Sequence, residues 1–108
     1  MSDKLEAAQR ALTVLDSALS YYPDDNQLLE SERALREFAA SIKVSHWIEQ
    51  AERAAFKGNF KRAVNHYRDA LFFMARESGA QTEEKRLTAD RINAEIERLR
   101  SLSARKLE

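Results

Sequence analysis

The sequence contains no cysteine, one proline and only two glycines. The lack of cysteine excludes disulfides, thiolate nucleophiles and the usual structural zinc sites, and it leaves the redox compartment undetermined. The scarcity of glycine and proline argues against a fold built of many tight turns. No stretch approaches the roughly 20 apolar residues that span a bilayer, and the first residues do not resemble a secretory signal. We therefore expect a cytoplasmic protein without a membrane segment.

The two signs of charge are balanced, with 18 basic and 18 acidic side chains among 108 residues. Consequently no net field draws the whole molecule to nucleic acids or to an anionic membrane. Alanine, leucine, glutamate, arginine and lysine are good helix formers and dominate the composition, which predicts an all-α fold. We expect a single domain over residues 1–106, because the final Leu107–Glu108 pair resembles a cloning scar.

Apolar residues recur every three or four positions in several segments, the spacing that places them on one face of a helix. This spacing predicts about five antiparallel helices, which cover residues 3–22, 25–42, 45–57, 60–77 and 82–103. The last of these is the most charged and has a narrow apolar seam. We expect it to cap the preceding hairpin, with its other side in water.

Capping residues and helix breakers set the ends of the predicted helices. Asp3, the pair Asp24–Asp25 and Thr82 each precede a helix, where their side-chain oxygens can accept hydrogen bonds from free backbone N–H groups. Pro23 ends the first helix, because the residue before a proline is pushed out of helical geometry. The segment Ser78–Ala80 ends the fourth helix.

The weakest part of the second predicted helix is Ser41–Ser45, where serine and β-branched residues cluster. We expect a turn there. In the alternative, residues 25–57 form one helix of about 50 Å, which is too long to pack well in so small a domain.

Small and aromatic residues alternate at fixed offsets over residues 44–71. Alanines at positions 51, 63 and 70 let two helices approach closely, large rings fill the remaining space, and Gly58 supplies the turn. This segment resembles a tetratricopeptide repeat (TPR). The resemblance is carried by Trp47, Ala51, Ala54, Gly58, Phe60, Ala63, Tyr67, Ala70 and Leu71.

The resemblance implies a helical-hairpin array with a C-terminal capping helix. It is clear over Val44–Leu71 and looser over Ala11–Pro23, which lies about half a repeat out of register, with an extra helix between. Stacked repeats need about three copies and a cap to be stable. The other helices, or a second chain, must therefore bury what further repeats would have buried. The alternative is an unrelated five-helix array whose Gly-Asn hairpin only looks like a repeat.

In the TPR family, the first helix of each repeat lines a groove that holds an extended peptide or a partner helix. Chaperone-binding members grip a C-terminal carboxylate with lysine, asparagine and arginine on this face, and those residues are absent here. An apolar wall beside two glutamates favours a basic or amphipathic segment instead. In the alternative, the glutamates only solvate a surface, and Ile48 and Phe56 belong to the core. The resemblance places on this face Ser45, Ile48, Glu49, Glu52, Ala55 and Phe56.

Residues for catalysis or metal binding are not arranged in any recognisable pattern. His46 and His66 fall on different predicted helices, without a carboxylate or cysteine at ligand spacing. The run Asp24–Asn26 lacks the calcium-loop pattern, so capping explains it better. We expect no enzymatic activity, no metal and no cofactor. A basic cluster around the Gly58 turn consists of Lys57, Lys61, Arg62 and Arg68. It resembles a nucleic-acid site only superficially, because Phe60 and Tyr67, the aromatic residues between these side chains, belong to the core of the motif.

Two functions remain. The first is a non-catalytic scaffold or adaptor whose groove binds a protein or peptide segment. The second is a structural self-association module, in which the heptad-spaced stripe of the first helix or the seam of the last pairs with another copy. A stable dimer in solution favours the second function, and a monomer with an open groove favours the first.

Overall fold

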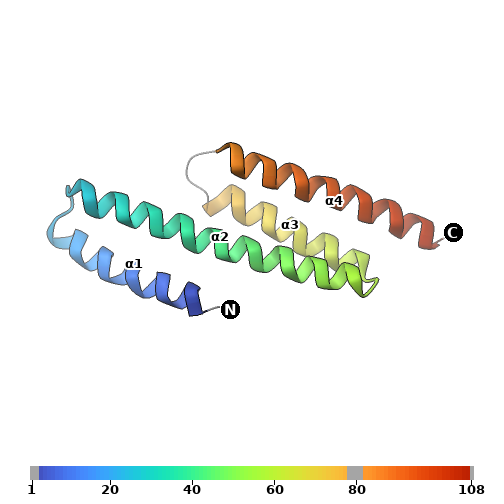
Figure 1. Cartoon of the computed structure of the whole chain (residues 1–108), viewed down its shortest axis with the longest axis horizontal. Coiled ribbons are helices and arrows are strands. Elements are labelled where there is room, and N and C mark those ends of the chain that lie inside the picture. The colour runs from blue at the N-terminus through green and yellow to red at the C-terminus, as the bar shows by residue number, and fades with distance from the viewer. Residues whose placement is uncertain (1–2, 78–81, 108) are drawn as a thin grey trace. The chain divides into compact units, whose positions relative to one another are not determined.

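In a computed structural model, which describes residues 3–77 and 82–107, the chain forms four α-helices (Figure 1). No strand occurs in these residues, which confirms the all-α prediction. The predicted helix end at Ser78–Ala80 and the last residue, Glu108, lie outside the described residues. The helices are α1 (Asp3–Tyr21), α2 (Asn26–Phe56), α3 (Phe60–Glu77) and α4 (Glu83–Leu107).

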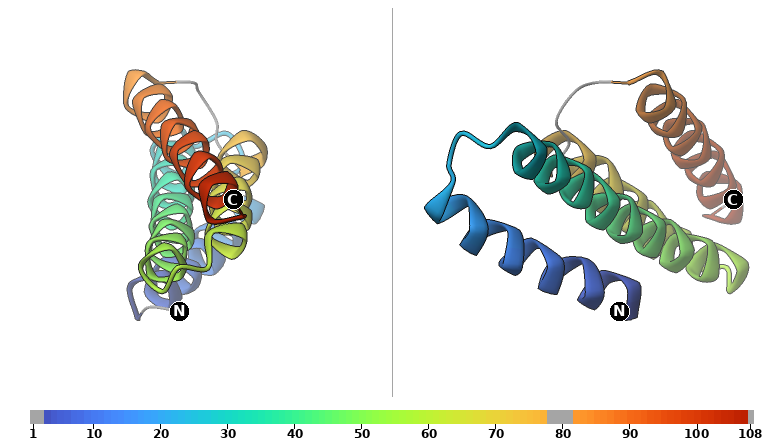
Figure 2. Two further views of the ribbon diagram at one scale, coloured as in Figure 1. Left: turned by 90° about the vertical axis from the view of Figure 1, so that its right-hand side faces the viewer. Right: turned by 60° about the vertical axis from the view of Figure 1, so that its left-hand side comes forward.

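The chain packs as two compact units, Met1–Lys43 and Val44–Glu108. The first unit contains α1 and the beginning of α2, which run antiparallel to one another. The second contains the end of α2 together with α3 and α4, and here too successive helices run antiparallel (Figure 2). Helix α2 belongs to both units, and the single domain expected over residues 1–106 stays a prediction.

The predicted turn at Ser41–Ser45 is wrong, because α2 continues through this segment without a break. The hydroxyl of Ser41 donates a hydrogen bond of 2.8 Å to the carbonyl oxygen of Phe38, so this serine is satisfied inside the helix. Ile42 packs against the core of the first unit and Val44 against the core of the second. Burial on both sides of the segment therefore outweighs its modest helix propensity. The helix is about 46 Å long, and this length does not prevent packing, because each of the two units packs against a different part of the helix.

The starts of α2 and α4 follow the predicted capping residues. The Asp25 carboxylate accepts hydrogen bonds from the backbone N–H groups of Gln27 and Leu28, at 3.0 and 3.2 Å. At the start of α4, the Thr82 hydroxyl accepts one from the N–H of Lys85 at 3.2 Å. These bonds satisfy N–H groups that have no partner within the helix, which fixes where α2 and α4 begin.

The turn between α2 and α3 is a Schellman motif centred on Gly58. This glycine has a φ of 81°, and the backbone N–H of Asn59 donates to the carbonyl oxygen of Ala54 at 2.9 Å. Asn59 then caps α3, since its side-chain oxygen accepts a hydrogen bond from the N–H of Arg62 at 3.2 Å. One glycine and one asparagine thus end one helix and begin the next within two residues.

We expect the Gly58→Ala substitution to lower the free energy of unfolding by about 1–2 kcal/mol, because a Cβ disfavours the left-handed region. Urea denaturation followed by circular dichroism measures this loss. Gly58→Asn is the matched control and should lose less, since asparagine tolerates positive φ better than alanine. Equal stability of the alanine variant and the parent protein would contradict the role given to this residue.

The first unit has a small core. Among its described residues, only Leu5, Ala8 and Ala39 are buried, with Leu35 and Ile42 packed against them. An ionic cluster links its two helices, formed by Asp16 on α1 with Glu32 and Arg36 on α2. Arg36 lies 3.0 Å from Glu32 and 3.8 Å from Asp16.

The neighbouring Glu32 carboxylate raises the pKa of Asp16, whereas the hydrogen bond from Arg36 lowers the pKa of Glu32. Both carboxylates are accessible to solvent, so the cluster makes a weak contribution to stability.

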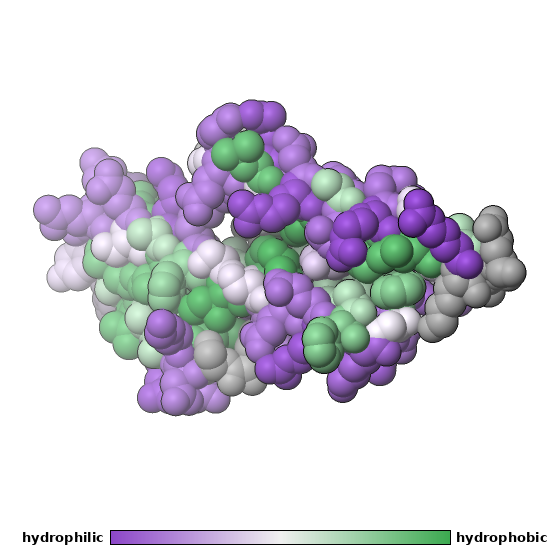
Figure 3. All heavy atoms as spheres, turned by 45° about the vertical axis from the view of Figure 1, so that its right-hand side comes forward, coloured by the Kyte–Doolittle hydropathy of each residue, from purple (hydrophilic) through white to green (hydrophobic). Residues whose placement is uncertain are grey.

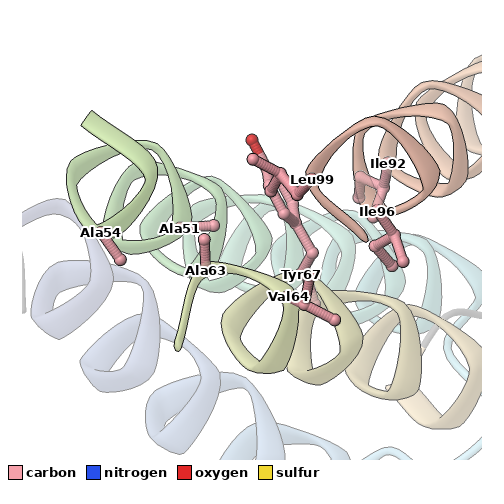
Figure 4. Packing of buried hydrophobic residues seen from close by; sticks show 9 residues of the cluster. Ala51, Ala54, Ala63, Val64, Tyr67, Ile92, Ile96 and Leu99 are labelled. Atoms are coloured by element: carbon pink, nitrogen blue, oxygen red, sulfur yellow. The ribbon is translucent and has the colours of Figure 1, made fainter. Parts of the chain in front are cut away.

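The second unit has a continuous core supplied by all three of its helical segments. Figure 4 shows the methyl groups of Ala51 on α2 and Ala63 on α3 pointing toward one another, while Ile92, Ile96 and Leu99 enter from α4. The alanines allow the close approach of α2 and α3, and α4 covers the hairpin. This core consists of Ala51, Ala54, Ala63, Val64, Tyr67, Ala70, Ile92, Ile96 and Leu99.

Candidate functional site

A groove of about 540 Å³ opens on the second unit, where the end of α2, the first half of α3 and the middle of α4 meet. The apolar floor of the groove includes Ile48, Ala55 and Phe60. On the face drawn in Figure 3, hydrophilic atoms make up most of the outer surface of the uppermost helix, α4, and hydrophobic atoms are visible below it. The complete lining is Ile48, Glu52, Ala55, Phe56, Phe60, Tyr67, Thr88, Arg91, Ile92, Glu95, Arg98 and Leu99.

Four of the six residues that the sequence placed on a binding face line this groove: Ile48, Glu52, Ala55 and Phe56. The other two, Ser45 and Glu49, are exposed on α2 and do not line it. Glu49 is held by Arg53 of the same helix, with an N–O distance of 2.6 Å.

The charge that Glu49 could offer to a partner is therefore already neutralised within the helix. Glu52 remains as the acidic side chain that α2 contributes to the groove.

Phe56 is 95% exposed at the end of α2, so the alternative that places it in the core is wrong. Ile48 is half-buried and packs against the core, so it serves the fold and the groove at once. Phe56 is the last residue of α2, directly before the turn formed by Gly58. A large apolar ring thus stands at the groove without being needed by the core.

Tyr67 reaches the groove from below. Its side chain rises from α3 toward Leu99 of α4, and its hydroxyl oxygen lies beside Leu99 (Figure 4). Burial raises the pKa of this phenol, and the negative charges of Glu95 and Glu52 raise it further. The hydroxyl is therefore neutral at physiological pH and can donate or accept a hydrogen bond.

The contribution of α4 to the groove was not predicted from the sequence. Arg91, Glu95 and Arg98 all line it, although the sequence suggested only a helix with one wetted side. Their place in the sequence could have indicated this, because each lies one residue before a buried residue of α4: Ile92, Ile96 or Leu99. Side chains next to a buried stripe stand at the edge of the contact, where a groove would form.

The basic cluster predicted around the turn is only partly brought together. Lys61 and Arg68 line a smaller hollow of about 250 Å³ between α3 and α4, together with Arg100. Lys57 and Arg62 are exposed and do not line it.

The two histidines do not form a site. His66 is half-buried with an unpaired Nδ1, and the ring of His46 lies 5.5 Å from that of Trp47. In residues 3–77 and 82–107, no three histidine, aspartate or glutamate side chains come together as a metal site would require.

Comparisons with protein-family models, with curated proteins and with solved structures found no match to this chain. None of the helices, over their described residues, has the length and apolar character needed to traverse a bilayer.

Proposed function

We propose that the chain is a non-catalytic scaffold or adaptor module, which binds a protein segment in the groove of the second unit. The single observation that supports this most is Phe56, a ring that is 95% exposed beside an apolar floor. Exposed aromatic residues next to a preformed concavity are typical anchors of protein interfaces. The apolar floor would bury one face of an amphipathic helix or alternate side chains of an extended peptide.

We also propose that the α2–α3 hairpin is TPR-like. In its support, Gly58 adopts the left-handed conformation at the turn, and Ala51, Ala63 and Ala70 are fully buried. Tyr67 is buried and Trp47 packs against the same core. The groove lies partly on the end of α2, the helix that would be the first of the repeat.

The test is a selection of peptides from a random library on the full-length chain, followed by calorimetric titration of the peptides recovered. Phe56→Ala is expected to weaken their binding by about 30-fold, the effect of removing one interface anchor of about 2 kcal/mol. Phe72→Ala is the matched control, because Phe72 is 63% exposed on α3 and lies outside the groove. Peptides that bind both variants as well as the parent, or a selection that recovers none, would argue against the proposal.

A second candidate function is self-association through the first unit. Large apolar side chains of this unit are exposed while its core remains small. A second copy could complete a four-helix arrangement. Sedimentation velocity that shows only monomer at all concentrations would dismiss this alternative. The exposed side chains are Val14, Tyr21, Tyr22, Leu29 and Phe38.

A further inference from the structure

The beginning of α3 and the end of α4 lie side by side and enclose a hollow of about 250 Å³ that carries three basic side chains (Figure 1). Lys61 and Arg68 come from α3, and Arg100 comes from α4. Among the described residues, none with an acidic side chain lines this hollow. We call it the basic hollow, and its complete lining is Phe60, Lys61, Val64, Asn65, Arg68, Leu99, Arg100 and Ser103.

Two of these three charges are not neutralised by the protein. Lys61 and Arg68 form no ion pair in residues 3–77 and 82–107, whereas the arginines at positions 10, 53, 86 and 98 each pair with an acidic side chain of their own helix. The sequence explains the difference, because no aspartate or glutamate lies three or four positions from Lys61 or Arg68. Arg100 pairs with Glu97 at 3.2 Å, but both side chains are exposed, and the guanidinium group keeps further N–H donors. The basic hollow therefore carries a net positive charge within an electroneutral chain.

The basic hollow adjoins the apolar groove of the second unit, because Phe60 and Leu99 line both. The charged side chains that line the groove itself are two glutamates and two arginines, so their charges cancel. The groove therefore selects neither sign of charge in a bound segment. A segment that leaves the groove past Phe60 meets the basic hollow next, and the preference for one sign of charge arises there.

We propose that the basic hollow is a subsite for acidic side chains, aspartate or glutamate, of the protein segment that binds in the groove. Their carboxylates accept charge-assisted hydrogen bonds from the ammonium group of Lys61 and from the guanidinium groups of Arg68 and Arg100. Asn65 and Ser103 add uncharged donors in the same hollow. The subsite rests on the proposed function, since it names the residue type that a groove-bound segment carries beside its apolar anchor.

A protein segment fits the basic hollow better than a nucleic acid does. Nucleic-acid sites spread positive charge along several phosphates, and those for single strands stack bases on aromatic rings. Here three cationic side chains surround one small hollow, and the ring of Phe60, which lines it, packs against the core. Lys57 and Arg62, the other basic residues near the turn, do not extend the hollow. The charge thus matches a short acidic run and not a continuous phosphate backbone.

The subsite is tested on the full-length chain with hexapeptides of defined charge, independently of any selected peptide. The probes are N-acetylated and C-amidated hexaglutamate, hexalysine and an uncharged Gly-Ser repeat of the same length, together with single-stranded hexathymidylate. Proton–nitrogen correlation spectra follow the backbone amide signals around Lys61, Arg68 and Arg100. A salt concentration of about 0.1 M screens charges that are distant from the hollow.

We expect hexaglutamate to shift these signals in a saturable manner, while the Gly-Ser and hexalysine peptides do not. The double variant with Lys61→Gln and Arg68→Gln should bind hexaglutamate about tenfold more weakly, because two exposed charge contacts are lost. The matched control combines Lys57→Gln with Arg62→Gln, which removes the same charge beside the same turn from exposed residues that do not line the hollow. The control should lose no more than about twofold, the effect of screened charges at a distance.

Four results would overturn the subsite. These are no saturable shift with hexaglutamate, an equal shift with the Gly-Ser peptide, equal losses in the two double variants, and tighter binding of hexathymidylate at the same signals, which would assign the hollow to nucleic acid. Failure of hexaglutamate while selected peptides still bind through Phe56 would reject the subsite alone. Binding of hexaglutamate with no peptide recovered by selection would instead reject the proposed function and leave an anion site.

Discussion

The Leu99→Ala substitution is expected to lower the free energy of unfolding by about 2–5 kcal/mol, the range for a fully buried leucine. Leu99 has no exposed surface and is the largest side chain of the described residues to be completely enclosed. It packs in the core that joins α4 to α2 and α3. Its truncation removes both the buried apolar surface and the contacts that hold α4 in place. Thermal and urea denaturation measure the effect.

The control for this prediction is Leu87→Ala, because Leu87 lies on the same helix and is 53% exposed. This change should alter stability by a much smaller amount, since most of its surface is already in water. If the two variants unfold at the same urea concentration, α4 is not held by the core described above.

The second large effect is expected for Ala63→Leu, which should destabilise the chain by about 1–3 kcal/mol through overpacking. Ala63 has no exposed surface, and its methyl group faces that of Ala51 across the α2–α3 contact (Figure 4). A leucine would push the two helices apart or adopt a strained rotamer. Differential scanning calorimetry should show a lowered unfolding temperature.

Ala75→Leu is the matched control on the same helix, because Ala75 is exposed and has room for a larger side chain. It is expected to leave the unfolding temperature nearly unchanged. A stable Ala63→Leu protein would mean that α2 and α3 are not in close apposition, which would remove the main support for a TPR-like hairpin.

The all-α class and the helix ends could be predicted from local chemistry. Caps such as Asp25 and Thr82, and the left-handed turn at Gly58, depend on residues only a few positions apart. The continuity of α2 could not be predicted, because serine and β-branched residues at 41–45 lower helix propensity only slightly. Tertiary burial of Ile42 and Val44 decides the outcome there, and it involves residues distant in the sequence.

Four of the twelve residues that line the groove could be predicted in the same way. Ile48, Glu52, Ala55 and Phe56 share one face of α2, and helical spacing alone brings them together. The wall from α4 and the exposure of the Tyr67 hydroxyl depend on how α4 lies over the hairpin. No local spacing encodes that placement. The ion pair between Glu49 and Arg53 was open to prediction, because the two residues are four positions apart on one helix.

Helix α2 gives the chain a gradient of local stability along a single element. Near Ala51 it is held by an extensive core, whereas toward Asn26 it is supported by only a few buried side chains. Fraying that begins at the thinly supported end removes hydrogen bonds one at a time and stops where the stronger core takes hold. The groove lies within the better-supported second unit, so local opening at the Asn26 end of α2 leaves its lining residues in place.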